Sequence, residues 1–264
     1  TFLKDTAVAA AGVTILPAAT VFGTAANSTL NMGVIGCGGR GTNVATSFVK
    51  HTETRLAAAA DLFKDRLTAA KEAFSKANAE KGRAALAESN LFLGSDAYLR
   101  LLESKEVDVV LIASPPFLHP EHLEATVQAG KHVYCEKPVA VDVSGCKRVI
   151  EAGKKAGDKL SLAVGFQIRH ASPYVAMVKK IHEGGIGDIV TAQACYFAGT
   201  VRVRDYPNAS PEERRLRHWI NYQVLSGDIL VEQGIHVVDI VNWTLQGHPI
   251  KAFGSHGRAG RKDQ

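Results

Sequence analysis

The feature that most constrains the fold of this chain is a glycine-rich turn, Gly36-Cys37-Gly38-Gly39-Arg40-Gly41, which separates an apolar segment from a helix-like segment. Gly36, Gly38 and Gly41 form a G-x-G-x-x-G pattern. The first glycine permits a tight turn, the second leaves the backbone open to a close approach, and the third lets the helix pack closely on the strand. The turn therefore predicts a strand that ends at residue 36 and a helix that begins at residue 39.

Strand-like and helix-like segments alternate over residues 30–168. The unbroken apolar run at residues 107–114 contains β-branched residues, as a strand buried on both faces requires. Such alternation favours right-handed βαβ units and a parallel sheet covered on both sides, an α/β fold of the doubly wound Rossmann type. We expect strands at residues 30–36, 55–60, 91–93, 107–114, 132–135 and 160–166, and helices at residues 39–50, 62–76, 96–104, 121–129 and 143–156.

Residues 169–264 follow a different pattern and are expected to form a partial substrate and oligomerisation domain. A helix is predicted at residues 174–183, a strand at 189–196 and a long apolar helix at 228–245, with a polar, arginine-bearing loop between the last two. A single strand cannot make a stable sheet alone. We therefore expect this domain to be incomplete, with its C-terminal part lying beyond residue 264.

An acidic residue at the end of the next predicted strand supports a dinucleotide site at the glycine turn. Asp61 ends the next predicted strand, twenty residues after Gly41. A carboxylate there accepts hydrogen bonds from the adenosine ribose and repels a 2′-phosphate, so the pattern favours NAD over NADP, whereas the nearby Lys64 and Arg66 leave NADP as an alternative. The alternative is a glycine-rich turn without a ligand. The cofactor-binding residues expected here are Gly36, Gly38, Gly39, Arg40, Gly41 and Asp61.

The segment Glu136-Lys137-Pro138 lies at the C-terminal end of another predicted strand. Ligands of open α/β sheets bind at that end. Lys137 there could hydrogen-bond a reacting hydroxyl, and burial near a cationic nicotinamide would lower its pKa and make it a usable acid or base. The alternative interpretation is a solvated surface charge.

The predicted helix at residues 228–245 is mostly apolar and carries an ionisable stripe formed by Glu232, His236 and Asp239, which are spaced four and then three residues apart. Side chains at that spacing share one helix face. Ionisable groups on a buried helix are costly unless they are paired or line a wet cleft. His236 could therefore take a proton from a substrate hydroxyl, with Glu232 orienting the ring. An internal hydrogen-bonded cap or an interdomain contact is the alternative.

Taken in order, these motifs resemble the glucose–fructose oxidoreductase, inositol dehydrogenase and MocA family over residues 30 to about 255. The resemblance implies an N-terminal Rossmann domain and a C-terminal α/β (α+β) domain with an open sheet. It also implies that Lys137 is the catalytic lysine and His236 the catalytic histidine. Glu232 stands where many members carry Asp, which keeps the carboxylate but lengthens the side chain.

The resemblance also suggests further site residues. Ser114, Pro115 and His119 match the segment that borders the nucleotide, and Glu136 is grouped with them as a cofactor-binding residue. Substrate is expected beside the Glu-Lys-Pro turn and the later helix. The aromatic rings of Trp219 and Tyr222 could stack on a sugar, with core packing as the alternative for Trp219. Arg169 is either a cleft residue or a surface ion pair. The full set of expected substrate residues is Lys137, Arg169, Trp219, Tyr222 and Asp239.

Three functions are consistent with these residues. The first is reversible oxidation of a hydroxyl of a sugar, glycoside or cyclic polyol by NAD or NADP. The second is a redox-neutral glycosidase, in which bound NAD transiently oxidises C3, the glycosidic bond eliminates and the hydride returns. The third is a non-catalytic protein that binds a nucleotide or sugar, against which the intact Lys137 and His236 argue.

Residues 1–29 form an expected leader, either an export signal remnant or a disordered arm. Thr1-Phe2-Leu3-Lys4 resembles the end of a twin-arginine signal, and the apolar run from Ala7 to Leu16 has the length of a signal core rather than of a membrane span. We expect the two arginines to precede Thr1 and the protein to be exported to the periplasm.

The composition of the chain limits the classes of ligand and partner that the protein is expected to bind. The net charge of +5 is mild, and the chain has no basic run interleaved with aromatic residues, which argues against nucleic-acid binding. The four cysteines form no C-x-x-C pair and lie at no zinc-finger spacing, so no metal site is expected. The expected partners are a small carbohydrate substrate and further copies of the same chain in a homo-oligomer, with no membrane span in the mature protein.

Overall fold

The computed structural model describes residues 29–199, 201, 204–255 and 257. The chain divides into two compact units, Thr1–Val164 and Gly165–Gln264. The division falls close to the boundary expected between residues 168 and 169. Nearly all of the expected leader at residues 1–29 lies outside the described residues. No helix in the described part of the chain is both long enough and apolar enough to cross a bilayer.

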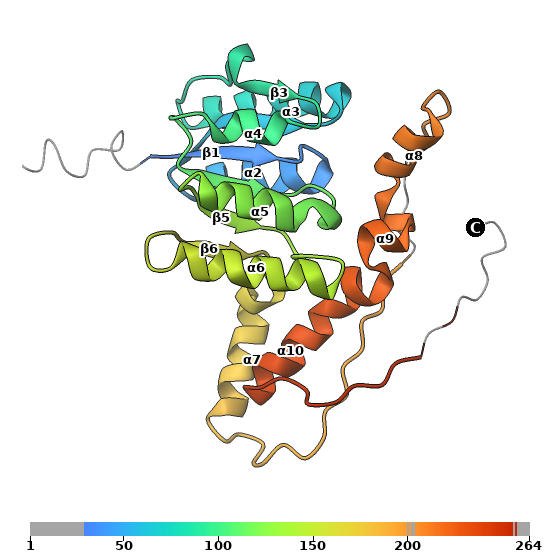
Figure 1. Ribbon diagram of the computed structural model, residues 1–264. Helices are drawn as coiled ribbons and strands as arrows, with labels where there is room; N and C mark the ends of the chain where they lie inside the picture. Colours follow the sequence, from blue (N-terminus) through green and yellow to red (C-terminus); the bar gives the residue numbers. More distant parts are fainter. Residues whose placement is uncertain (1–28, 200, 202–203, 256, 258–264) are drawn as a thin grey trace, which may run out of the picture. The chain divides into compact units, whose positions relative to one another are not determined.

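The first unit is built on a six-stranded parallel sheet (Figure 1). The strand order is β3-β2-β1-β4-β5-β6, so β1 and β4 lie side by side in the middle. This is the order of the doubly wound dinucleotide-binding fold, and it confirms the α/β Rossmann prediction. The strands are β1 (Leu30–Ile35), β2 (Thr54–Asp61), β3 (Leu91–Leu93), β4 (Val109–Ile112), β5 (His132–Cys135) and β6 (Leu162–Val164).

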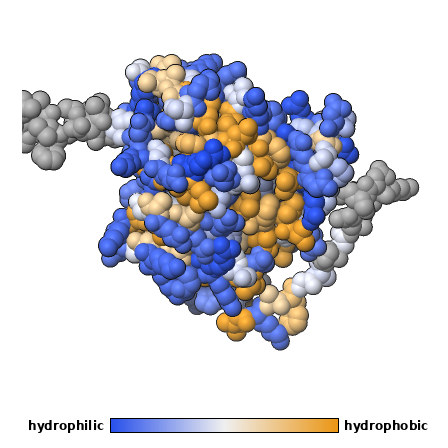
Figure 2. All heavy atoms as spheres, turned by 45° about the horizontal axis from the view of Figure 1, so that its top comes forward, coloured by the Kyte–Doolittle hydropathy of each residue, from blue (hydrophilic) through white to orange (hydrophobic). Residues whose placement is uncertain are grey.

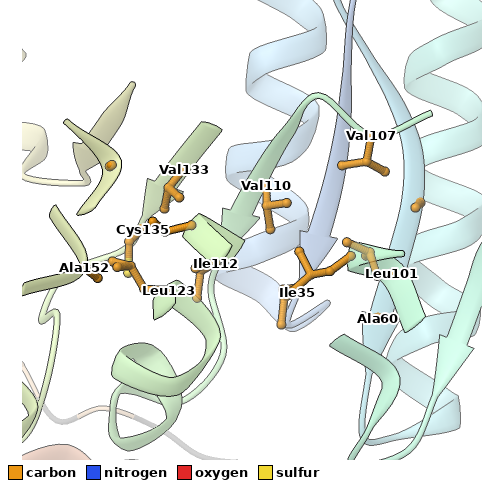
Figure 3. Packing of buried hydrophobic residues seen from close by; sticks show 14 of the residues in the cluster. Ile35, Ala60, Leu101, Val107, Val110, Ile112, Leu123, Val133, Cys135 and Ala152 are labelled. Carbon is orange, nitrogen blue, oxygen red and sulfur yellow. The ribbon is translucent and has the colours of Figure 1, made fainter. Parts of the chain in front are cut away.

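Helices cover both faces of this sheet. Successive side chains of a strand point to opposite faces, and β4 shows the result: Val110 and Ile112 belong to one buried cluster, whereas Leu111 belongs to the other. The cluster on the α4, α5 and α6 side is drawn in Figure 3. The helices of this unit are α2 (Gly39–His51), α3 (Lys64–Glu80), α4 (Ala97–Leu102), α5 (His119–Gln128) and α6 (Val143–Ala156).

A buried lysine fixes the start of β5, the strand that leads to the predicted Glu-Lys-Pro turn. The ammonium of Lys131 donates hydrogen bonds to the main-chain carbonyls of Ser104 and Val107, each at 2.8 Å. These two acceptors belong to the segment between α4 and β4. The lysine thereby ties the entry of β5 to the entry of β4, and the two strands run in register to a common edge.

The second unit consists of short helices. They are η3 (Gln167–His170), α7 (Ser172–His182), α8 (Pro211–Arg217), η4 (Trp219–Asn221), α9 (Gln223–Ser226), η5 (Leu230–Gly234) and α10 (Ile235–Leu245). Helices α7 and α10 pack against each other (Figure 1). In the described part of this unit, Val178 is the only buried hydrophobic residue. The most exposed large hydrophobic side chains of the described chain are Val190, Phe197, Ile250 and Phe253, and Figure 2 shows hydrophobic surface beside hydrophilic surface on one face.

One expectation for the second unit is wrong. Residues 189–196 do not form a strand, and the described residues beyond Val164 contain none. A strand needs the N–H and C=O groups of a neighbour, and no neighbouring strand is described in this unit. The expected helix at residues 228–245 is present, because helical residues run without a break over this range. Its first part contains the π-helical turn η5, Asp228 at its start has a φ of 66°, and the regular α-helix α10 begins at Ile235.

A buried asparagine completes the edge of β2. Strand β3 pairs only with the last three residues of β2, which leaves Leu56 beyond its reach. The side chain of Asn78, fully buried on α3, accepts a hydrogen bond from the N–H of Leu56 at 3.0 Å and donates one to its carbonyl at 2.9 Å. A side-chain amide thus replaces the missing strand neighbour, as buried main-chain groups require a partner.

Replacing Asn78 with Leu should therefore destabilise the protein. The volume is nearly kept, but two main-chain groups of Leu56 lose their partner, at a cost of about 2 kcal/mol or more. Urea unfolding of the full chain would measure this loss. The control is Lys76→Leu on the same helix, where the side chain is exposed. Equal stability of the two variants would show that the amide is dispensable.

Candidate active site

The glycine turn joins β1 to α2 by a contact that only glycine permits. Gly36 has a φ of 92°, and a Cβ built on it would lie 2.4 Å from the main-chain nitrogen of Ser114. A Cβ on Gly41 would lie 2.0 Å from the carbonyl oxygen of Gly36. These two glycines therefore serve the close packing of the turn against the end of β4 and against helix α2. Both roles agree with the sequence prediction.

The middle of the same turn is open. A Cβ on Gly38 would come no closer than 3.5 Å to any described atom, the nearest being on the Arg66 side chain, and one on Gly39 would meet nothing within 4 Å. Helix α2 begins at Gly39, has no side-chain cap and carries no acidic residue in its first turn. The first N–H groups of α2 therefore have no side-chain acceptor, and they lie with the positive end of the helix dipole at the open part of the turn. This is the geometry that binds a pyrophosphate. The turn accordingly fits a dinucleotide.

Asp61 lies at the C-terminal end of β2 and is bound to the turn. One carboxylate oxygen accepts a hydrogen bond from the N–H of Cys37 at 2.7 Å, and the other accepts one from the N–H of Phe63 at 2.8 Å. Burial raises the pKa of Asp61, while these two N–H groups and the charge of Arg66 act in the opposite direction. Each carboxylate oxygen keeps a further lone pair. The side chain is therefore held in place for the ribose contact that the sequence predicts.

A charged pair connects the glycine turn to the end of β5. The guanidinium of Arg40 donates a hydrogen bond from Nη2 to Oε1 of Glu136 at 3.0 Å, and its Nε forms an ion-pair contact with Oε2, also at 3.0 Å. Glu136 is buried, whereas the Arg40 side chain is half exposed. The two residues were expected to contact the cofactor independently, and the structure pairs them with each other. Lys137 follows directly and is partly buried, and the peptide bond between Lys137 and Pro138 is cis.

The segment after β4 is held by two histidines of α5. The hydroxyl of Ser114 lies 2.9 Å from Nδ1 of His122. His119 is 1% exposed, and both of its ring nitrogens face main-chain carbonyls. Its imidazole can therefore influence a nucleotide only through those carbonyls. Pro115, which precedes the short helix η2 (Pro116–Leu118), is partly buried. His122 was missed in the sequence, although its position three residues after His119 places both on one helix face.

In the second unit, His236 is buried at the start of α10 and lies among aromatic rings. Its imidazole stacks on Tyr196, with ring centroids 5.5 Å apart and planes at 22°, and meets Phe166 edge-on at 6.5 Å. Glu232, one turn earlier, is partly buried in the π-helical turn η5. Such turns are frequent at functional sites. Tyr196 was not foreseen, because it lies forty residues away in a segment expected to be a strand.

Two expected substrate residues bind each other. The guanidinium of Arg169 donates two hydrogen bonds to the carboxylate of Asp239, each at 2.8 Å, and lies 5.5 Å from the centre of the Trp243 ring. The carboxylate raises the pKa of Arg169 further. The surface ion pair considered for Arg169 is therefore present. The pair braces η3 against α10 within this unit.

The other two expected substrate residues belong to the segment before η5. Trp219 begins η4 and is partly buried, whereas Tyr222 is exposed. The guanidinium of Arg215 lies over the ring of Tyr222 at 5.4 Å, a cation–π contact. No group of three or more side chains suited to hold a metal occurs among the described residues.

The fold and the turn define a dinucleotide-binding protein of the doubly wound class. Residues 30–166, just over half of the chain, match the family described as an oxidoreductase family with an NAD-binding Rossmann fold, and the chain belongs to this Gfo/Idh/MocA family.

Several known proteins are similar to the chain. Inositol 2-dehydrogenase 2 of Saccharopolyspora erythraea is 32% identical over 218 residues, which cover 82% of the chain and 54% of that protein. An aldose–aldose oxidoreductase from Caulobacter crescentus matches with a TM-score of 0.60 at 23% identity, covering 83% of the chain and 58% of that structure. A levoglucosan dehydrogenase in complex with NADH and levoglucosan matches with a TM-score of 0.57 at 25% identity, covering 82% and 54%. The chain thus spans about half the length of these relatives.

Changing Gly36 or Gly38 to Ala should affect two different properties, the stability of the fold and the affinity for NAD. Gly36→Ala should lower the melting temperature, because a Cβ there collides with Ser114 and the positive φ costs about 1 kcal/mol more. Gly38→Ala should keep the melting temperature but weaken NAD binding about tenfold or more, since the methyl group enters the space of the pyrophosphate. Thermal unfolding and nucleotide titration measure the two effects.

Gly153→Ala is the control for this pair, because a Cβ at that position in α6 meets nothing within 4 Å. It should keep both properties. Unchanged nucleotide affinity in Gly38→Ala would contradict the assignment of this turn as the pyrophosphate cradle.

Proposed function

We propose that this protein is an NAD-dependent oxidoreductase that transfers a hydride between the nicotinamide and a hydroxyl group of a sugar, glycoside or cyclic polyol. The observation that carries the proposal is the common sheet edge shared by the open glycine turn, Asp61 and the Glu136-Lys137 turn, with the Arg40–Glu136 pair joining two of them. Relatives that include inositol 2-dehydrogenases and a levoglucosan dehydrogenase support this substrate class.

The chemistry needs a hydride acceptor and a proton acceptor. The open glycine turn and Asp61 would hold NAD, which when bound would supply the hydride acceptor for the carbon that carries the reacting hydroxyl. Lys137, beside the glycine turn, would hydrogen-bond that hydroxyl and stabilise the charge that develops on its oxygen. The family resemblance is the support for His236 as the proton acceptor. Glu232 lies in the turn that precedes His236 and orients the imidazole. The products are the ketone and the reduced nicotinamide, so electrons and protons balance.

The decisive experiment uses the complete protein purified without added cofactor. Denaturation releases any bound nucleotide, which mass spectrometry identifies. The native protein is then incubated with NAD and a panel of inositols, aldoses and glycosides while absorbance at 340 nm and free sugar are followed together. Accumulation of reduced nucleotide with a ketone supports the dehydrogenase. Release of sugar at constant absorbance would replace it with the redox-neutral glycosidase, and absence of both would favour a binding protein.

Lys137→Met and His236→Asn should each lower kcat at least about 100-fold while leaving the Kd for NAD nearly unchanged, because each removes a side chain assigned to the hydroxyl chemistry without touching the glycine turn. Steady-state kinetics and nucleotide titration provide the two numbers. Lys147→Met and His51→Asn change exposed residues and serve as matched controls. Full activity in either test variant would remove that residue from the mechanism.

We propose that NAD is preferred to NADP because the Asp61 carboxylate would face a 2′-phosphate. Asp61→Ser should raise the Kd for NAD about tenfold and lower the Kd for NADP, since the repelling charge is gone and the Arg66 guanidinium, which lies 5.3 Å from the Phe63 ring, remains nearby. Fluorescence titration with both nucleotides measures the ratio. Asp158→Ser, an exposed position, is the control. An unchanged ratio of the two affinities would show that Asp61 does not select the cofactor.

We also propose that the protein is exported by the twin-arginine route and assembles with copies of itself. The support for export is the sequence of residues 1–26, and the support for assembly is the largely exposed apolar surface of the second unit. Fractionation of cells that express the complete reading frame, with and without a working twin-arginine translocase, tests the first part. Light scattering tests the second.

A further inference from the structure

The first turn of α5 presents two buried histidines to the end of β4. His119 and His122 are 1% and 6% exposed, and both contact Ser114. Nδ1 of His122 lies 2.9 Å from the serine hydroxyl, and Nε2 of His119 lies 2.7 Å from the serine carbonyl. Burial lowers the pKa of each ring to about 4. Ser114 is thus held at two separate atoms by neutral imidazoles.

His119 also reaches the neighbouring strand end. Its Nδ1 lies 2.6 Å from the carbonyl oxygen of Pro138, the residue directly after Lys137. One ring therefore bridges the segment after β4 and the segment after β5. Because the ring is rigid and fully buried, the distance between the two carbonyls is set by the size of the imidazole.

Each end of this bridge leads to a different part of the site. The main chain at Ser114 forms the wall against which Gly36 packs, since a Cβ on that glycine would lie 2.4 Å from the serine nitrogen. The carbonyl of Pro138 belongs to the backbone that carries Lys137. A shift of the first carbonyl would move the nucleotide cradle, and a shift of the second would move the lysine.

The proton count makes the two ends unequal. Both carbonyl oxygens are acceptors only, and a neutral imidazole has a single N–H. Burial keeps the ring neutral at neutral pH, and the positive charge of Lys137 acts in the same direction. His122, the other ionisable group facing the ring, is itself neutral there. The ring therefore donates to the Pro138 carbonyl in one tautomer and to the Ser114 carbonyl in the other, so each nitrogen serves its own carbonyl in its own tautomer.

We propose that His119 is a positioning residue for the reaction: its Nδ1 side sets the backbone of Lys137 through the carbonyl of Pro138, and its Nε2 side sets the glycine turn through the carbonyl of Ser114. The inference rests on the proposed function, because it assumes that Lys137 handles the reacting hydroxyl. On this proposal the Nδ1 side of the imidazole affects kcat, and the Nε2 side affects the KM for NAD.

Substitution of His119 by Asn or by Gln tests the Nδ1 and Nε2 contacts separately. The amide nitrogen of Asn at position 119 stands near the place of Nδ1, and that of Gln stands near the place of Nε2. His119→Asn should keep the bond to Pro138 and should retain kcat within about threefold, while the KM for NAD rises. His119→Gln should keep the bond to Ser114 and the NAD affinity, while kcat falls about 10- to 100-fold through misplacement of Lys137.

A second measurement does not depend on turnover. In protein labelled with ¹³C at lysine Cε, the resonance of Lys137 is identified by its loss in Lys137→Arg, and its titration midpoint is followed in each variant. His119→Gln should shift this midpoint and His119→Asn should not. Thermal unfolding of both variants, with His51→Asn as the control, reports any loss of fold.

The outcomes are distinct. Equal losses of kcat and NAD affinity in both variants, with an unchanged Lys137 titration, would reduce His119 to a packing residue and overturn the inference. If the wild-type protein oxidises no substrate, the proposed function fails, yet the Lys137 titration still decides whether His119 sets the lysine.

Discussion

The approach of Gly36 to the main chain of Ser114 is the contact on which the arrangement of the first unit depends. Strands β1 and β4 are neighbours in the sheet, but their following helices cover opposite faces, so the chain leaves the two strand ends in opposite directions. The space between these ends is the crevice where doubly wound sheets bind ligands. A side chain at position 36 would close it, because its Cβ would overlap the nitrogen and carbonyl groups of the facing segment.

Polar contacts then fix the other strand ends around this crevice. Asp61 binds the N–H of Cys37, and Arg40 binds Glu136 through a hydrogen bond and an ion-pair contact. A buried carboxylate is costly to desolvate unless its oxygens are satisfied. Arg40 and the main-chain N–H groups meet that requirement for Glu136 and Asp61 respectively, so these acidic residues order the site before any ligand arrives. Such order reduces the entropy lost on binding.

Local sequence patterns predicted the first unit well and the second poorly, for physical reasons. The central strands β1, β2 and β4 are largely apolar and each ends at a turn, which leaves a readable sequence pattern, and the glycine spacing marks the crevice. Residues 189–196 carry a strand-like pattern but lack a neighbour in the described structure. The Arg40–Glu136 and Arg169–Asp239 pairs, and the bridge made by His119, join residues far apart in sequence. The periodicity of a local segment does not indicate which acidic residue pairs with which basic residue far away in the sequence.

The three ionisable residues on the helix at residues 228–245, Glu232, His236 and Asp239, have different surroundings in the structure although their spacing places them on one helix face. Asp239 needs no substrate to account for its place on an apolar helix, because the Arg169 guanidinium satisfies both of its oxygens. Glu232 lies within the π-helical turn η5, and His236 lies in the regular helix that follows. His236 is buried against the faces and edges of aromatic rings, which hold its plane. These ring contacts constrain the plane of the imidazole, which the spacing of the stripe alone did not indicate.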